Sequence, residues 1–261
     1  MKLPIYYVDA FTENLFSGNP AAVIFSDLND GPLMQNIAAE NNLSETAFIR
    51  KDKQKYYIRW FSPSCEIDLC GHATLASAFV FFNHIDKTED VFEVESTKNG
   101  TLKINKRDDY LYLDFPTDDF KENHDYDIVE KALGVKPVEL YKGRDDILAI
   151  FDNESDITNL DPDFDSFKDI SVRGLIASAP GNDCDFVSRC FFPSTGVNED
   201  PVTGSAHTTL TPYWSKRLSK KTLVANQLSK RGGVLYCEDY GDRIFIGGKA
   251  VQYMKGEITT S

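Results

Sequence analysis

Apolar residues recur along most of this chain in short runs, several of them alternating with polar residues, which is typical of β-strands. In the first half, these runs occupy residues 5–11, 21–25, 43–49, 56–61, 91–96, 101–105 and 110–115. In the second half, they occupy residues 138–141, 146–151, 170–177, 185–192, 222–227, 233–238 and 243–246. The pattern predicts a protein rich in short strands.

A smaller number of segments have the spacing of helices. Residues 33–41 and 126–133 are amphipathic, and Gly134 ends the second of these segments. Residues 71–82 are also expected to form a helix, but apolar side chains cover nearly every face of it. A helix that is apolar on all sides is buried in the protein. Residues 208–218 form its expected counterpart in the second half. Together the elements predict a mixed α/β protein, of the α+β type, without the regular alternation of a dinucleotide-binding fold.

One motif occurs twice, in residues 61–75 and 192–207, half the chain apart. Each copy has an aromatic strand ending in a Pro-Ser pair, then an acidic loop, and then a glycine with a polar residue before an apolar stretch. The repeat predicts two similar halves, each presenting a loop and a helix start to a shared cleft that holds a small polar ligand.

We place the boundary between the halves after residue 115, in an acidic and irregular stretch. The N-terminal half is then residues 1–115 and the C-terminal half residues 116–261. Their central helices are expected at about residues 71–83 and 205–218, and the last strand is free to return to the N-terminal half.

The formal net charge of −13 argues against nucleic acid and anionic membranes as partners, because both are bound by clustered lysine and arginine. No apolar run approaches the length of a membrane span. The five cysteines have no zinc-site spacing, and we expect a cytoplasmic protein in which they stay reduced. Nucleotide-binding, metalloprotease and serine-hydrolase motifs are absent, so an enzyme built on this chain is expected to work without a metal or nucleotide cofactor.

The first motif region contains two candidates for acid/base chemistry. Glu45 lies where a turn meets an apolar strand, and an apolar wall favours the protonated carboxyl, which suits a general acid or base near neutral pH. The alternative is a solvated glutamate at a strand edge. His72 follows Gly71 at the start of the buried helix, where it could act as an acid, orient a base or help to bind an anion. The alternative is a structural capping histidine.

The remaining candidates lie at the two helix starts. Cys70 is either a thiol activated by a helix N-terminus or a buried structural cysteine. Asp200 could orient a bound molecule or share a proton, and its alternative is a turn-forming aspartate before proline. Ser205 is a reasonable N-cap and is also placed to hold a substrate carboxylate on the helix amides. Asp68 and Glu199 have weaker claims, and His207 is expected to belong to the body of the second central helix.

These motifs resemble the PhzF-like family of phenazine biosynthesis-like proteins. The similar segments span almost the whole chain in family order: residues 9–11, 16–23, 43–48, 70–74 and 199–207. The resemblance implies the diaminopimelate-epimerase-like fold, in which two pseudo-symmetric halves each curl a barrel-like sheet around a central helix, with the active site in the cleft between them.

The resemblance also implies an isomerase without cofactor, acting on a small carboxylate and assembled as a homodimer. By motif, Glu45 would move the proton, while His72, Asp200 and Ser205 would bind and polarise the substrate. Gly71 and Gly204 would permit close approach of the backbone, and Asn19 and Cys70 would contribute to substrate binding.

One departure separates the chain from the related epimerases, which use one cysteine from each half. Here Cys70 lies near the first of these positions, but the second loop offers Asp200, so a two-thiol epimerase is not expected. Two alternatives to the isomerase stay open: a ligand-binding or scaffold protein that retains the fold without turnover, and a thiol-dependent enzyme built on Cys70.

Overall fold

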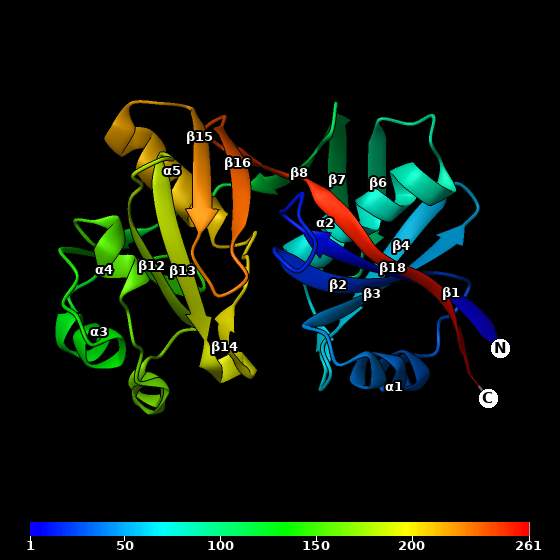
Figure 1. The fold of residues 1–261 in the computed structure, drawn as a ribbon, viewed down its shortest axis with the longest axis horizontal. Helices are drawn as coiled ribbons and strands as arrows, with labels where there is room; N and C mark the ends of the chain where they lie inside the picture. The colour runs from blue at the N-terminus through cyan, green and yellow to red at the C-terminus, as the bar shows by residue number, and fades with distance from the viewer. Residues whose placement is uncertain (261) are drawn as a thin grey trace. The chain divides into compact units, whose positions relative to one another are not determined.

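The computed structural model describes residues 1–260, and the chain divides into two compact units. Unit 1 consists of Met1–Asp114 together with the residues from Gly247 onward, and unit 2 is Phe115–Ile246. The chain leaves unit 1 within strand β8 and returns to it within strand β17. Both units are drawn in Figure 1.

Unit 1 is a curled sheet that encloses one helix. Its strands are β1 (Lys2–Ala10), β2 (Asn19–Phe25), β3 (Glu45–Asp52), β4 (Lys55–Phe61), β5 (Glu66–Ile67), β6 (Val91–Ser96), β7 (Gly100–Arg107), β8 (Tyr110–Pro116) and β18 (Ala250–Thr259). Helix α1 (Gly31–Asn41) packs against β3 and β4, and helix α2 (Gly71–Val80) contacts β1, β2, β3 and β18 (Figure 1). A π-helical turn, Phe81–Ile85, extends α2.

Helix α2 is buried on nearly every side, as its apolar sequence predicts. Nine of its ten residues are buried, and Phe79 is partly exposed. A helix with this burial can lie only inside a sheet that curls around it. The strands of unit 1 therefore fix the position of the α2 N-terminus.

Unit 2 repeats this arrangement with different sequences. Its strands are β9 (Lys121–Glu122), β10 (Glu139–Lys142), β11 (Asp146–Ile150), β12 (Gly174–Pro180), β13 (Phe186–Phe192), β14 (Val197–Asp200), β15 (Thr222–Gln227), β16 (Gly233–Asp239) and β17 (Arg243–Gly248). Its helices are α3 (Tyr126–Leu133), α4 (Glu154–Thr158), the 3₁₀ turns Phe164–Asp169 and Pro193–Thr195, and the central helix α5 (His207–Leu218).

The order of strand pairing is the same in the two units. In unit 1, β2 pairs parallel with β3, β3 antiparallel with β4, β4 parallel with β6, and β6 antiparallel with β7. In unit 2, β11 pairs parallel with β12, β12 antiparallel with β13, β13 parallel with β15, and β15 antiparallel with β16. In the sequence, the central helix of each unit lies between the two strands of the second parallel pair. Helix α2 lies between β4 and β6, and α5 lies between β13 and β15. The predicted mixed α/β class with two pseudo-symmetric halves is confirmed.

Two local predictions are wrong. The strand expected at residues 170–177 begins only at Gly174. A 3₁₀ turn ends at Asp169, and residues 170–173 connect this turn to the strand. Ser205 does not cap the second central helix: α5 begins at His207, Ala206 occupies the cap position, and no side chain caps it. The Ser205 hydroxyl is therefore available for another contact.

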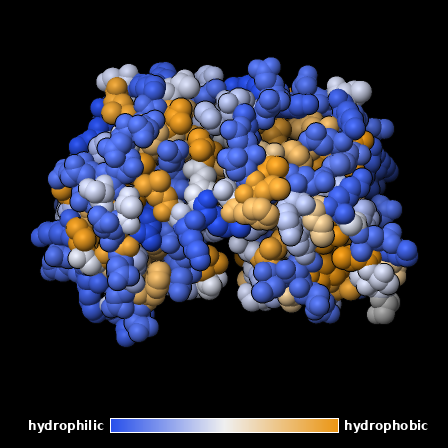
Figure 2. Space-filling view, viewed as in Figure 1, coloured by the Kyte–Doolittle hydropathy of each residue, from blue (hydrophilic) through white to orange (hydrophobic). Residues whose placement is uncertain are grey.

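Figure 2 shows hydrophilic residues over most of the face that it displays. Within residues 1–260, no helix combines the length and the apolar character that crossing a membrane requires.

Candidate active site

In unit 1, two strand starts and one helix start bring four candidate residues together. Asn19 is the first residue of β2 and Glu45 is the first residue of β3, and these parallel neighbours are in register, with Ala21 opposite Glu45. Cys70 precedes helix α2, and His72 is its second residue. The parallel pairing therefore aligns Asn19 and Glu45 at one edge of the sheet, where α2 begins.

His72 is the centre of this cluster. Its Nε2 lies 3.1 Å from Oε2 of Glu45. Its Nδ1 lies 3.0 Å from Nδ2 of Asn19 and 3.5 Å from Sγ of Cys70. The exposed fractions of the side chains are 6% for His72 and 16% for Glu45, so Glu45 is the member with more access to solvent. The carboxylate can thus reach a ligand on one side while contacting the imidazole on the other.

The charge state of His72 follows from its neighbours. Burial by itself would lower the pKa of His72, but Cys70 and Glu45 raise that pKa well above its ordinary value. We attribute the net rise to Glu45, whose carboxylate lies 3.1 Å from the ring. Nε2 of His72 therefore donates a hydrogen bond to the Glu45 side chain and holds it in place.

Cys70 does not have the activated thiol that its place before a helix suggests. Its side chain is buried, and burial together with the Glu45 charge raises the pKa of Cys70 to about 11. Desolvation of the thiolate thus outweighs the helix N-terminus and the neighbouring imidazole. Of the two alternatives for Cys70, this environment favours the buried structural cysteine, because the raised pKa keeps the side chain a thiol at neutral pH.

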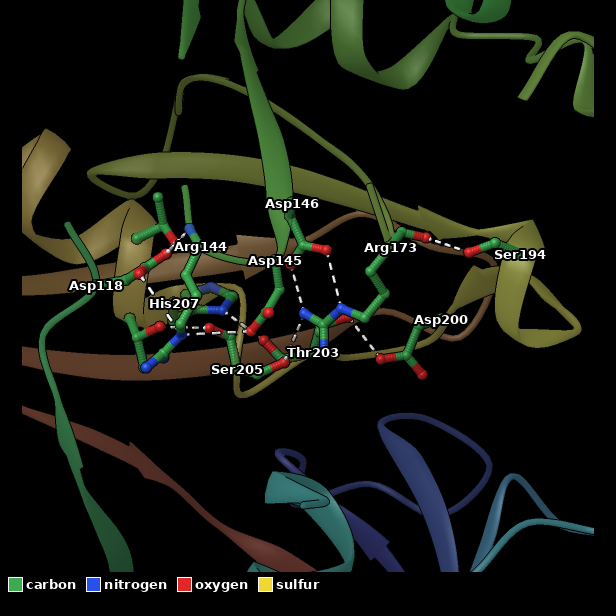
Figure 3. Close-up of polar contacts among 12 residues, drawn as sticks. Asp118, Arg144, Asp145, Asp146, Arg173, Ser194, Asp200, Thr203, Ser205 and His207 are labelled. Carbon is green, nitrogen blue, oxygen red and sulfur yellow. Dashed lines mark hydrogen bonds and ion pairs between the residues drawn. The ribbon is translucent and has the colours of Figure 1, made fainter. Parts of the chain in front are cut away.

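In unit 2, an ion pair lies beside the start of α5 (Figure 3). The Arg173 guanidinium binds Asp146 through two hydrogen bonds, of which the bond from Nε to Oδ1 measures 2.9 Å. The same Nη2 group that completes the pair also lies 3.3 Å from Oγ of Ser205. The Asp146 side chain is 7% exposed and that of Arg173 is 35% exposed, so the buried carboxylate orients a guanidinium that solvent still reaches.

Hydrogen bonds hold the loop before α5 in one conformation. Thr203 Oγ1 donates to Oδ2 of Asp200 at 2.6 Å, and Nε2 of Gln227 donates to the Asp200 carbonyl at 2.8 Å. The His207 ring binds the Thr203 carbonyl through Nδ1 at 2.8 Å. Burial lowers the pKa of His207 to about 4, so the ring is neutral and Nδ1 donates. Asp200 is thus fixed as the end of a rigid turn.

The predicted residues fall into two groups, one in each unit. Glu45, His72, Cys70 and Asn19 are in contact in unit 1, and Gly71 is buried among them at the helix start. Asp200, Gly204 and Ser205 share one loop in unit 2, but Asp200 bonds to Thr203 while Ser205 contacts Arg173. Glu199 forms an ion pair with Arg189 and has a structural role.

Sequence analysis did not single out Arg173 or Asp146. Neither residue lies in a recognisable motif, but the internal repeat contains the signal. In unit 1, Glu45 begins the second strand of the first parallel pair and contacts His72 at the central helix. In unit 2, Arg173 immediately precedes the corresponding strand, β12, and contacts Ser205 before the central helix. The same place in the fold holds a carboxylate in one unit and a guanidinium in the other.

Two units with the same strand order, each curled around a buried helix, define the diaminopimelate-epimerase-like class of fold. The comparisons agree with this class and narrow it. The chain belongs to the PhzC-PhzF family of phenazine biosynthesis-like proteins, which it matches over residues 8–256. The family resemblance found from the motifs is confirmed.

Relatives extend over the whole chain. A Pseudomonas aeruginosa protein named as an uncharacterized isomerase is 46% identical over 263 residues and is matched in full, as is this chain. The crystal structure of a PhzF-family protein from Enterococcus faecalis is 48% identical, with a TM-score of 0.96 and complete coverage of both chains. A predicted epimerase from Pseudomonas aeruginosa, 17% identical with a TM-score of 0.79 over 99% of this chain and all of that chain, shares the fold. The relatives' names support isomerase activity in general.

Proposed function

We propose that this protein is an isomerase that moves a proton within a small carboxylate substrate, with Glu45 as the general acid/base. The observation that carries the proposal is the contact of 3.1 Å between Oε2 of Glu45 and Nε2 of His72, in a cluster with little exposure to solvent. In this proposal Nε2 of His72 orients the Glu45 carboxylate, which accepts a proton from carbon, and the partial exposure of the Glu45 side chain lets the carboxyl return the proton at a second carbon.

His72 and Asn19 orient the base in this proposal. The Asn19 side chain is fully buried and lies 3.0 Å from Nδ1 of His72, so it fixes the plane of the ring. A fixed ring holds Nε2 toward Glu45 and prevents the carboxylate from turning away from its productive position. Protein side chains alone then supply the acid and the base.

In unit 2, the proposal assigns the binding of a carboxylate group to Ser205 and Arg173. The hydroxyl and the guanidinium lie 3.3 Å apart, and the N-terminus of α5 adds amide donors and the positive end of its dipole. Asp146 orients Arg173 through two hydrogen bonds. Asp200 lies in the same loop as Ser205, before α5, and accepts a hydrogen bond from Thr203. The carboxylate is the part of the substrate that this chemistry recognises.

Hydrogen exchange with solvent tests the proposal. The protein is incubated in deuterated water with a panel of hydroxy-, amino- and dihydroaromatic carboxylates, and deuterium entering any compound is followed by mass spectrometry. Wild-type protein should incorporate deuterium into a substrate, and Glu45→Gln should lose incorporation by about a hundredfold or more while remaining folded.

The matched control is Glu40→Gln, which makes the same change at an exposed position of helix α1. Its rate of incorporation should equal that of the wild type. Undiminished exchange in Glu45→Gln would remove Glu45 from the mechanism. Binding of a panel member without any exchange would instead favour a ligand-binding protein that retains the fold. We also propose a homodimer, which sedimentation equilibrium tests directly.

A further inference from the structure

Three side chains of the unit 1 cluster offer one oxygen, one sulfur and one nitrogen donor. The donor atoms of Glu45, Cys70 and His72 all lie within 4.8 Å of one another. Among residues 1–260, no other group of at least three His, Cys, Asp or Glu side chains is found with donors this close. We propose that this trio binds a borderline-soft divalent cation such as Zn²⁺, and that the bound cation reversibly inhibits the isomerase.

The two donor distances that involve His72 are close to those of a tetrahedral site. Zinc–ligand bonds of ordinary length place two ligand atoms about 3.3 to 3.6 Å apart along each edge of a tetrahedron. Nε2 of His72 lies 3.1 Å from Oε2 of Glu45 and 3.9 Å from Sγ of Cys70. Both distances come within range through small side-chain rotations, without movement of the backbone.

The donor set also selects the kind of cation. A thiolate and an imidazole favour Zn²⁺ and Cd²⁺ over Mg²⁺ or Ca²⁺, which take oxygen ligands. Three protein ligands leave the fourth position of a tetrahedron for water. Glu45 is partly exposed, and solvent could reach the site past its side chain.

Coordination would block the proposed chemistry. The Cys70 thiol binds a cation as the thiolate and Nε2 of His72 binds through its lone pair, so each of the two groups gives one proton to solvent when the cation binds. The Glu45 oxygen that accepts the substrate proton becomes a metal ligand, so catalysis stops until a chelator removes the cation. The binding site depends on geometry alone, whereas its inhibitory effect rests on the proposed function of Glu45.

Cadmium is a suitable probe, because a cadmium–thiolate bond absorbs in the ultraviolet and needs no substrate to be detected. The full chain, freed of metal with a chelator, is titrated with CdCl2, and Zn²⁺ affinity is measured by competition. We expect one cadmium per chain, no competition by Mg²⁺, and loss of the absorption band in Cys70→Ser. The matched control is Cys65→Ser, an exposed cysteine of the same unit, which should keep the band.

His72→Gln provides a second variant, and it should weaken Cd²⁺ binding by about tenfold or more while leaving the thiol in place. If circular dichroism shows that Cys70→Ser does not fold, His72→Gln is the variant that tests the site. A band that persists in Cys70→Ser, or one that disappears in Cys65→Ser, would overturn the site. The expected cadmium pattern together with deuterium incorporation that bound Cd²⁺ leaves unchanged would uphold the site and overturn its inhibitory role, which separates the two proposals.

Discussion

Arg173 has two partners that affect stability and binding differently. Removing its charge in Arg173→Met leaves the carboxylate of Asp146 buried without a partner, and we expect unfolding in urea to show a loss of about 3 kcal/mol. If Arg173 also binds the substrate carboxylate, KM should rise by about tenfold or more in the same variant.

The double variant Arg173→Met with Asp146→Asn separates these effects. It removes the unpaired buried charge, so most of the lost stability should return, but KM should stay high because the guanidinium is still absent. A KM that recovers together with stability would show that Arg173 has only a structural role.

His207 should make the protein sensitive to acid. Its pKa falls from 6.5 to about 4 on folding, because the buried ring resists protonation. A lowered folded pKa gives a contribution to stability that is complete above pH 6.5 and is lost as the pH falls toward 4. The shift corresponds to about 3 kcal/mol.

The measurement is the free energy of unfolding of the wild type and of His207→Gln between neutral and acidic pH. The wild type should lose about 3 kcal/mol more than the variant over this range. His124→Gln, at an exposed position, serves as the control and should follow the wild type. Parallel curves for wild type and His207→Gln would contradict the neutral buried ring.

The sequence identified residues that carry a local signal. Glu45 stands at the boundary between a turn and an apolar strand, and His72 follows a glycine at the start of an apolar helix, so both were predicted. Arg173 precedes its strand without such a signal, because its significance comes from Asp146, 27 residues earlier, and Ser205, 32 residues later. The pKa of Cys70 could not be predicted either, since it depends on how completely the fold buries the thiol.

At the level of elements, a proline inside helix α5 leaves one helix carbonyl free to bind the segment that contains Asp118. Pro212 has no N–H to donate to the Thr208 carbonyl four residues earlier, and the backbone N–H of Asp118 donates to that carbonyl instead, at 3.2 Å. The side chain of Asp118 also accepts a hydrogen bond from Thr209 Oγ1 at 2.8 Å. The missing helical bond is thus replaced by a bond to the segment that precedes β9.

Replacing Pro212 should therefore increase the stability of the protein only slightly. A proline inside a helix ordinarily costs about 3 kcal/mol relative to alanine. We expect Pro212→Ala to change the free energy of unfolding by less than about 1 kcal/mol, because the new N–H only competes with Asp118 for one carbonyl. Thermal and urea unfolding would measure this, with the exposed Lys216→Ala in the same helix as control. A stabilisation near the full value would show that the Asp118 bond contributes little.

The elements themselves were largely predictable, since period and composition mark them. The buried character of α2 followed from its lack of a polar face, and the ends of α3 followed from Gly134. Strand β18 escaped prediction because its residues are mostly exposed or half-buried, and no regular burial pattern distinguishes it from a loop. Its structure comes from pairing with β1, which the local sequence does not encode.

On the scale of the whole molecule, unit 1 is built from two separate parts of the chain. Strand β18 pairs with β1 from Lys2 opposite Thr259 to Ala10 opposite Ala250. Removing residues 249–261 should therefore expose the β1 edge and the buried Ile5 and Val8, and unit 1 should lose hydrogen-exchange protection while unit 2 keeps its own. Mass spectrometry of exchanged peptides distinguishes the units, and a truncation of residues 260–261 alone is the control. Equal protection in the long truncation and the wild type would contradict the role of β18.

The late position of β18 in the chain affects how the protein folds during synthesis. A ribosome completes all of unit 2 before it reaches β18, so unit 2 can fold while β1 still waits for one of its two neighbours. During that interval the nascent protein carries an open strand edge, which is a template for association with other chains. Translation of β18 thus decides when β1 is protected, and the cell's demand for chaperones on this protein should depend on how quickly that segment is translated.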